Sequence, residues 1–243
     1  MTTNDKRYEM ALLADAAYAD LDWQVGQEIG GVTLRTLLTD GDDPRLTVAE
    51  ANILVRNYTV VAECHSTLTG FDAPVFRDNR VAAGQPGRYV MAIQGSKDLV
   101  QDWFVADGLL TLVGEAIPQV ASLRAFMAQL TTPSSQGGYG LLGLGDLIDV
   151  TGHPLGGHLV HSLASQYQGR VNQAYTFNGA NNKIEALFLA LRAGTAVLTG
   201  QETPYYPANV TNTIAEPGLE VVPGIATGLR IGDVVLHFIE DQT

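Results

Sequence analysis

Residues 147–177, LIDVTGHPLGGHLVHSLASQYQGRVNQAYTF, decide the fold. The apolar run from Leu147 to Thr151 predicts a buried strand, and a glycine-rich turn follows it. Apolar spacing over 155–168 predicts a helix, and the β-branched and aromatic residues of 171–177 predict a second strand. Because a strand, a crossover helix and a strand form a βαβ unit, we expect a parallel sheet with a right-handed crossover.

Upstream of this unit the sequence predicts three more strands and two helical regions. The strands are apolar runs rich in β-branched or aromatic residues: 57–64 (NYTVVAEC), 69–79 (TGFDAPVFRDN) and 88–95 (RYVMAIQG). The last run is nearly continuous, which is typical of a central strand covered on both faces. Helical spacing marks 7–21 and 98–130, where Pro118 should start a second helix or kink the first.

Composition restricts the classes of function. The chain has 243 residues, 46% hydrophobic and 16% charged, which suits a single globular α/β domain over residues 1–243. Its net charge is -12 at pH 7 with no Lys/Arg cluster, so we expect no nucleic-acid partner. We also expect no membrane-spanning segment, since no window approaches the ~20 apolar residues of a membrane span. Cys64 is the only cysteine, and the polar start MTTNDKRYEM predicts no secretory signal peptide.

The turn between the predicted strand and helix is Gly152-His153-Pro154-Leu155-Gly156, which matches GxSxG except at the central position. In α/β-hydrolases GxSxG forms a nucleophile elbow, in which a serine projects from a strained turn and the glycines avoid steric overlap. The N–H of the next residue, here Leu155, helps to form an oxyanion hole at the helix N-terminus. A glycine turn between a strand and a helix is also common without catalysis, so the motif alone leaves both interpretations open.

A wider stretch around this turn carries a family resemblance. The run 150–180, VTGHPLGGHLVHSLASQYQGRVNQAYTFNGA, resembles the VTGHSLGGHLA segment of bacterial lipases of the class 3 and repeat-in-toxin kinds. Residues 69–79 and 88–107 are similar to the strand pair, oxyanion loop and Asp-rich helix of that group. Residues 218–242 are similar to its acid-bearing segment. The resemblance implies an α/β-hydrolase fold with a mostly parallel central sheet flanked by helices, acting on small-molecule esters or lipids.

The resemblance also implies where the nucleophile and the oxyanion donors lie. It assigns the nucleophile position to Pro154 and the donors to Ser96 and the Leu155 amide. Proline has no hydroxyl to attack a carbonyl, and its φ of about -65° excludes the positive φ usual for an elbow nucleophile. Proline also favours an extended conformation for His153 before it. We therefore expect a rebuilt turn on an intact fold that is inactive as a serine esterase.

The acid and the base of the triad are implied with more alternatives. Glu220 is the first candidate acid, and Glu216 and Asp233 are rivals. The order serine, acid, histidine leaves His237 as the candidate base. Related lipases carry the histidine several residues after an IEDQ-like stretch, so either His237 has taken over or the base lies outside residues 1–243, and we favour the second. No cofactor and no metal is implied.

Other residues give competing interpretations. The serines at 134, 135, 162 and 165 read as ordinary loop and helix positions, and Cys64 and His65 are adjacent in a strand and should face opposite sides. His158 and His161 have spacing that suits a metal, but no HExxH motif accompanies them. Residues 181–207 contain an apolar helix that is either a lid over a lipid site or a packed crossover helix.

Three functions follow from these alternatives. The first is an inactivated lipase or esterase scaffold, and the second is a non-catalytic module that binds an apolar ligand or a protein in the former acyl pocket. A third, weaker hypothesis is residual hydrolysis by a water held near His153. The glycine-rich calcium repeats of exported relatives do not occur in these residues, so no calcium site is expected. Origin as a domain of a secreted bacterial protein stays open.

Overall fold

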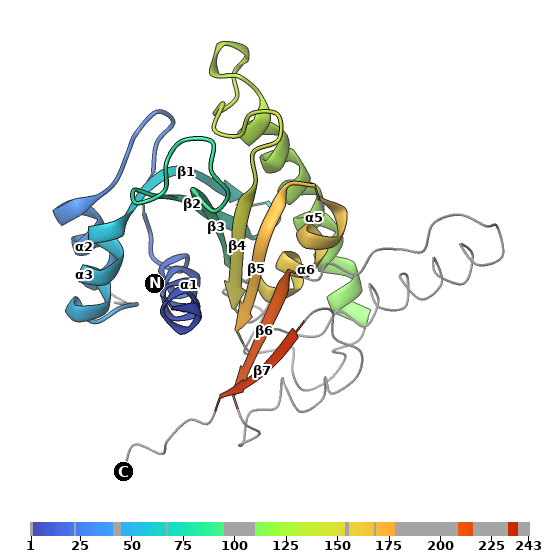
Figure 1. The fold of residues 1–243 in the computed structure, drawn as a ribbon. Helices are drawn as coiled ribbons and strands as arrows, with labels where there is room; N and C mark the ends of the chain where they lie inside the picture. Colours follow the sequence, from blue (N-terminus) through green and yellow to red (C-terminus); the bar gives the residue numbers. More distant parts are fainter. Residues whose placement is uncertain are drawn as a thin grey trace, which may run out of the picture.

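The described residues form one seven-stranded sheet with helices on both faces (Figure 1). The computed structural model describes residues 2–21, 23–40, 45–66, 68–94, 110–153, 156–167, 169–177, 209–215 and 233–237. The predicted segment 181–207 lies outside these ranges. None of the described helices combines the length and the apolar character that crossing a membrane requires.

The strands lie across the sheet in chain order. They are β1 (Tyr58–Ser66), β2 (Phe71–Asp78), β3 (Tyr89–Gln94), β4 (Ile148–His153), β5 (Val171–Phe177), β6 (Val210–Ala215) and β7 (Asp233–His237). The pairs β1–β2 and β2–β3 are antiparallel, and every pair from β3 to β7 is parallel. The mostly parallel central sheet is therefore confirmed. Because parallel strands end at one edge, the carboxyl ends of β3 to β7 share the lower edge in Figure 1.

The helices agree less closely with the prediction. They are α1 (Thr3–Ala16), α2 (Gly31–Thr39), α3 (Val48–Asn57), α5 (Leu110–Thr131) and α6 (Gly156–Gln166), with a 3-10 turn η1 (Ser134–Gln136). The predicted first helix, 7–21, is wrong at both ends, since a capping box of Thr2 and Asp5 starts α1 earlier and it ends at Ala16. Pro118 does not start a second helix, because α5 continues through it.

Two hydrophobic cores lie on opposite faces of the sheet. Alternating residues of β3 feed both: Met91 and Ile93 belong to one core, and Val90 and Ala92 belong to the other. The first core is covered by α5 and α6, and the second by α1, α2 and α3 (Figure 1). This confirms that 88–95 contains a central strand covered on both faces. Helix α5 connects β3 to β4, and α6 connects β4 to β5, so both connections run in the same direction across the sheet. Because such crossovers are right-handed, α5 and α6 lie on the same face.

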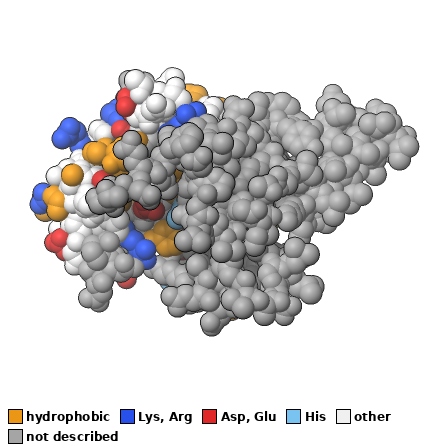
Figure 2. Space-filling model, turned by 90° about the horizontal axis from the view of Figure 1, so that it is seen from below, with side chains coloured by type: hydrophobic (Ala, Val, Ile, Leu, Met, Phe, Trp, Pro, Cys, Tyr) orange, Lys and Arg blue, Asp and Glu red, His pale blue; other side chains and the backbone are white. Residues whose placement is uncertain are grey.

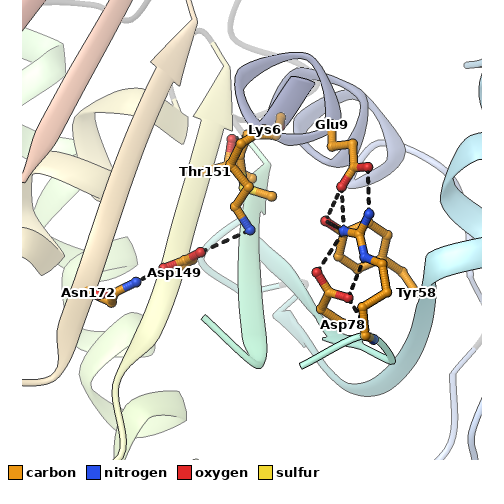
Figure 3. A network of polar contacts seen from close by, with 9 residues as sticks. Lys6, Glu9, Tyr58, Asp78, Asp149, Thr151 and Asn172 are labelled. Carbon is orange, nitrogen blue, oxygen red and sulfur yellow. Dashed lines mark hydrogen bonds and ion pairs between the residues drawn. The ribbon is translucent and has the colours of Figure 1, made fainter. Parts of the chain in front are cut away.

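An arginine and two buried carboxylates link α1 to the β1–β2–β3 side of the sheet (Figure 3). Arg80 donates to both carboxylate oxygens of Glu9 at 2.9 and 2.6 Å, and to those of Asp78 at 2.8 and 2.7 Å. The Tyr58 hydroxyl donates to Glu9 at 2.6 Å. One guanidinium thus neutralises two carboxylates whose side chains are 9% and 3% exposed.

A second set of contacts joins α1 to β4, the strand that leads to the glycine turn (Figure 3). The Asp149 carboxylate forms an ion pair with Lys6 at 3.1 Å and accepts a hydrogen bond from the Asn172 amide at 2.7 Å. The buried Thr151 hydroxyl donates to the Met10 carbonyl oxygen at 2.9 Å. The position of α1 is therefore linked to that of β4.

Candidate active site

Gly152, His153 and Gly156 form the described part of a strand-to-helix corner at the carboxyl edge of the sheet. Gly152 lies in β4, His153 ends that strand, and Gly156 begins α6. A Cβ on Gly152 would lie 2.6 Å from the carbonyl carbon of Gly156, and a Cβ on Gly156 would lie 2.0 Å from the carbonyl oxygen of Ile93. Neither glycine has a positive φ, so it is the lack of space that disfavours a larger residue at each position.

The strand that leads to the expected oxyanion loop ends beside this corner. Gln94, the last residue of β3, is the register partner of His153. Pro154, Leu155 and Ser96 lie outside the described residues, and the segments that carry them follow these two neighbouring strand ends. His153 belongs to β4 and is therefore extended, as expected for a residue before proline.

Tyr18 contacts the corner from the turn after α1. Its hydroxyl donates a hydrogen bond to the carbonyl oxygen of His153 at 2.5 Å. The Arg45 guanidinium lies over the Tyr18 ring, 5.2 Å from its centroid. Sequence reasoning missed this contact, because an aromatic residue at helical spacing signals core packing and gives no sign of its hydrogen-bond partner.

A row of polar side chains crosses four strands at the same level. The register pairs His65 with Asp72, Asp72 with Gln94, and Gln94 with His153. The His65 Nδ1 lies 2.8 Å from the Asp72 carboxylate. In the orientation that satisfies its amide, Gln94 donates to Asp72 at 3.1 Å and to the Ala17 carbonyl oxygen at 3.3 Å. The end of β3 is thus held from both sides.

Burial at the end of β1 raises the pKa of two neighbouring groups. Burial, followed by the charge of Asp72, raises the pKa of Glu63 to about 7. The same causes, with the charge of Glu63 added, raise the pKa of the Cys64 thiol to about 11. A thiol with so little thiolate at neutral pH is a poor nucleophile.

Within the described residues, neither the serines nor a cluster of metal-ligating side chains indicates a second catalytic site. Ser162 is buried in α6, and its hydroxyl accepts a hydrogen bond from Gln166 at 2.8 Å. Where the structure is described, no three or more His, Cys, Asp or Glu side chains gather in a way that suits a metal ion. In the view from below, the described residues that can be seen lie on one side of the molecule, where acidic, basic and hydrophobic side chains are interspersed (Figure 2).

The candidate acid and base fall unevenly within the described residues. Glu216 and Glu220 lie outside them. Asp233 begins β7 and so lies towards the amino edge of the sheet. His237 ends β7 opposite Ala215, and β7 is three strands from β4. At about 4.8 Å between neighbouring strands, the backbone of His237 is roughly 14 Å from the end of β4.

Comparison with known proteins supports the fold assignment. The sequence matches no protein-family model and no curated protein. The structure is similar to the crystal structure of Lip2 lipase from Yarrowia lipolytica, with a TM-score of 0.53 and 14% sequence identity, covering 96% of this chain and 78% of that one. It is also similar to lipase II from Rhizopus niveus, with a TM-score of 0.47 and 15% identity, covering 93% and 77%. Together, the first similarity and the mostly parallel sheet flanked by helices show that this chain has the α/β-hydrolase fold.

Proposed function

We propose that the chain is a lipase- or esterase-type carboxylester hydrolase scaffold that is inactive as written, because Pro154 occupies the nucleophile position. The observation that carries this proposal is the corner itself. Backbone contacts under 3 Å require glycine at both 152 and 156, the two fixed positions that flank the nucleophile in GxSxG. Such close backbone packing at the corner is expected where the residue between the two glycines must project above the sheet edge.

The surroundings of the corner suit acyl-transfer chemistry. Residue 154 lies two positions before the first residue of α6, and the N-terminal N–H groups and dipole of a helix stabilise developing negative charge. Ser96 follows the neighbouring strand β3 and is the proposed second oxyanion donor. The substrate class, a carboxylic ester of a lipid or small molecule, follows from the sequence resemblance and agrees with the lipase name of the structural neighbour.

The proposed acid is Glu220, as the resemblance implies. The proposed base is a histidine other than His237, which lies within β7. A serine placed at 154 would attack the ester carbonyl once its proton passes to that base. Proline supplies neither the hydroxyl nor the proton. The second candidate function, binding of an apolar ligand without turnover, is favoured by this same loss on an otherwise preserved corner.

A cysteine at 154 gives the sharpest test, because a thiol needs less help from a base than a hydroxyl does. In a Cys64→Ala background, Pro154→Cys, Pro154→Ser and Pro154→Ala are compared on p-nitrophenyl butyrate. We expect Pro154→Cys to release a burst of one equivalent of p-nitrophenol, because α6 lowers the pKa of a thiol at its N-terminus. Pro154→Ser should turn over when imidazole is added, and Pro154→Ala should match buffer.

The contradicting result is equally defined. If folded Pro154→Cys is acylated no faster than free cysteine, the corner does not act as an elbow and the hydrolase scaffold is rejected. If the original chain nevertheless binds decanoate, measured by calorimetry, the ligand-binding function replaces it.

A further inference from the structure

Two consecutive residues after α1 hold the ends of the two strands that lead into the proposed site. The Ala17 carbonyl oxygen accepts a hydrogen bond from the Gln94 amide at the end of β3, and the Tyr18 hydroxyl donates to the His153 carbonyl at the end of β4. Each contact lies one residue before a proposed functional segment. A single short turn therefore touches both the oxyanion strand and the corner.

We propose that Tyr18 is a positioning residue, which fixes the peptide group joining His153 to residue 154; this inference rests on the proposed function. A peptide bond is planar, so the His153 carbonyl and the nitrogen of residue 154 turn as one unit. A hydrogen bond on that carbonyl sets the orientation of the plane. It therefore sets the direction in which the chain leaves β4 and the side chain at 154 projects.

The turn can do this because it is itself rigidly held. The Ala17 N–H donates to the Leu13 carbonyl at 3.1 Å, and the Tyr18 N–H donates to the Asp15 carbonyl at 3.0 Å. Ala17 is 1% exposed, so its carbonyl is packed against the sheet. In the middle of the helix, Glu9 is bound by Arg80 as described above. The Tyr18 side chain therefore extends from a backbone segment whose position is fixed by these contacts.

The test separates geometry from simple reactivity. In the Cys64→Ala, Pro154→Cys chain, Tyr18→Phe is compared with Tyr8→Phe, which removes a hydroxyl from α1 at a residue that is 49% exposed. Alkylation by iodoacetamide needs only a thiolate, whereas acylation by p-nitrophenyl butyrate also needs correct placement against the oxyanion donors. We expect Tyr18→Phe to slow acylation about tenfold and to leave alkylation and its pH profile unchanged.

A second measurement needs no reaction at 154. With histidine labelled at its carbonyl carbon, Tyr18→Phe in the original chain should move the His153 carbonyl resonance, and Tyr8→Phe should not. Equal acylation rates in the two variants, or an unmoved His153 resonance, overturn the inference. If Pro154→Cys is not acylated in any background but the resonance moves, the hydrolase function fails while the hold of Tyr18 on the corner stands.

Discussion

The Gly156 α-carbon lies so close to the Ile93 carbonyl oxygen that an added Cβ would be 2.0 Å away. Through this contact the first turn of α6 packs against the end of β3. Helix α6 follows β4 in the chain, and β3 is the neighbouring strand in the sheet. The neighbouring atom is backbone and cannot swing aside as a side chain would. The corner at 152–156 is therefore shaped by the adjacent strand as well as by its own sequence.

Gly156→Ala should lower the free energy of unfolding by about 2–3 kcal/mol, because either α6 or β3 must shift to admit the methyl group. Urea unfolding followed by circular dichroism measures this change. Gly169→Ala, in the turn after α6, is the matched control, since a Cβ there has no atom within 4 Å. Equal effects of the two substitutions would show that α6 is not seated this closely.

Arg80→Met should lower the free energy of unfolding by about 2–3 kcal/mol, because it leaves the buried carboxylates of Glu9 and Asp78 without their cation. Arg77→Met provides the control. Arg77 also forms two hydrogen bonds to a carboxylate, that of Glu28, but this side chain is 57% exposed. Water replaces the cation there, so we expect a change of at most about 1 kcal/mol. A larger loss for Arg77→Met would contradict this ranking.

The stability contributed by Glu63 should fall as pH rises. Its pKa is raised from 4.5 to about 7, so between these values the native state binds more protons than the unfolded state. Unfolding then becomes easier as pH increases through this window. Glu63→Gln should remove about 1–2 kcal/mol of the decline between pH 5 and pH 8, measured by urea unfolding at each pH. Glu28→Gln should leave the decline in place, because Arg77 lowers the pKa of Glu28.

Cys64 should react slowly in the folded protein. A pKa raised to about 11 leaves roughly a hundredfold less thiolate at pH 8 than an ordinary thiol would have. Its rate with Ellman's reagent should rise by about that factor in 6 M guanidinium chloride. Asp72→Asn should speed the native reaction, because the Asp72 charge contributes to the raised pKa. A native rate equal to the unfolded rate would refute the burial argument.

Local sequence patterns predicted much of the sheet for identifiable reasons. Strand β3 was found because a residue buried on either face must be apolar, and β5 because β-branched and aromatic residues favour a pleated surface. The prediction missed α2 and α3, because no element was predicted between residues 21 and 57. Thr47 and Glu50 form a capping box at the start of α3, so a local signal was present and was overlooked.

The strand, the glycine turn and the helix within 147–168 could be predicted from local sequence, because burial periodicity and the steric demand for glycine are properties of neighbouring residues. Which element covers each face, and which side chains meet, depends instead on contacts between segments that are far apart in the chain. Tyr18 and His153 are 135 residues apart, and Arg80 and Glu9 are 71 apart. Periodicity reports that a face is buried but not what buries it, so these contacts depend on how α1 docks against strands that come much later in the chain.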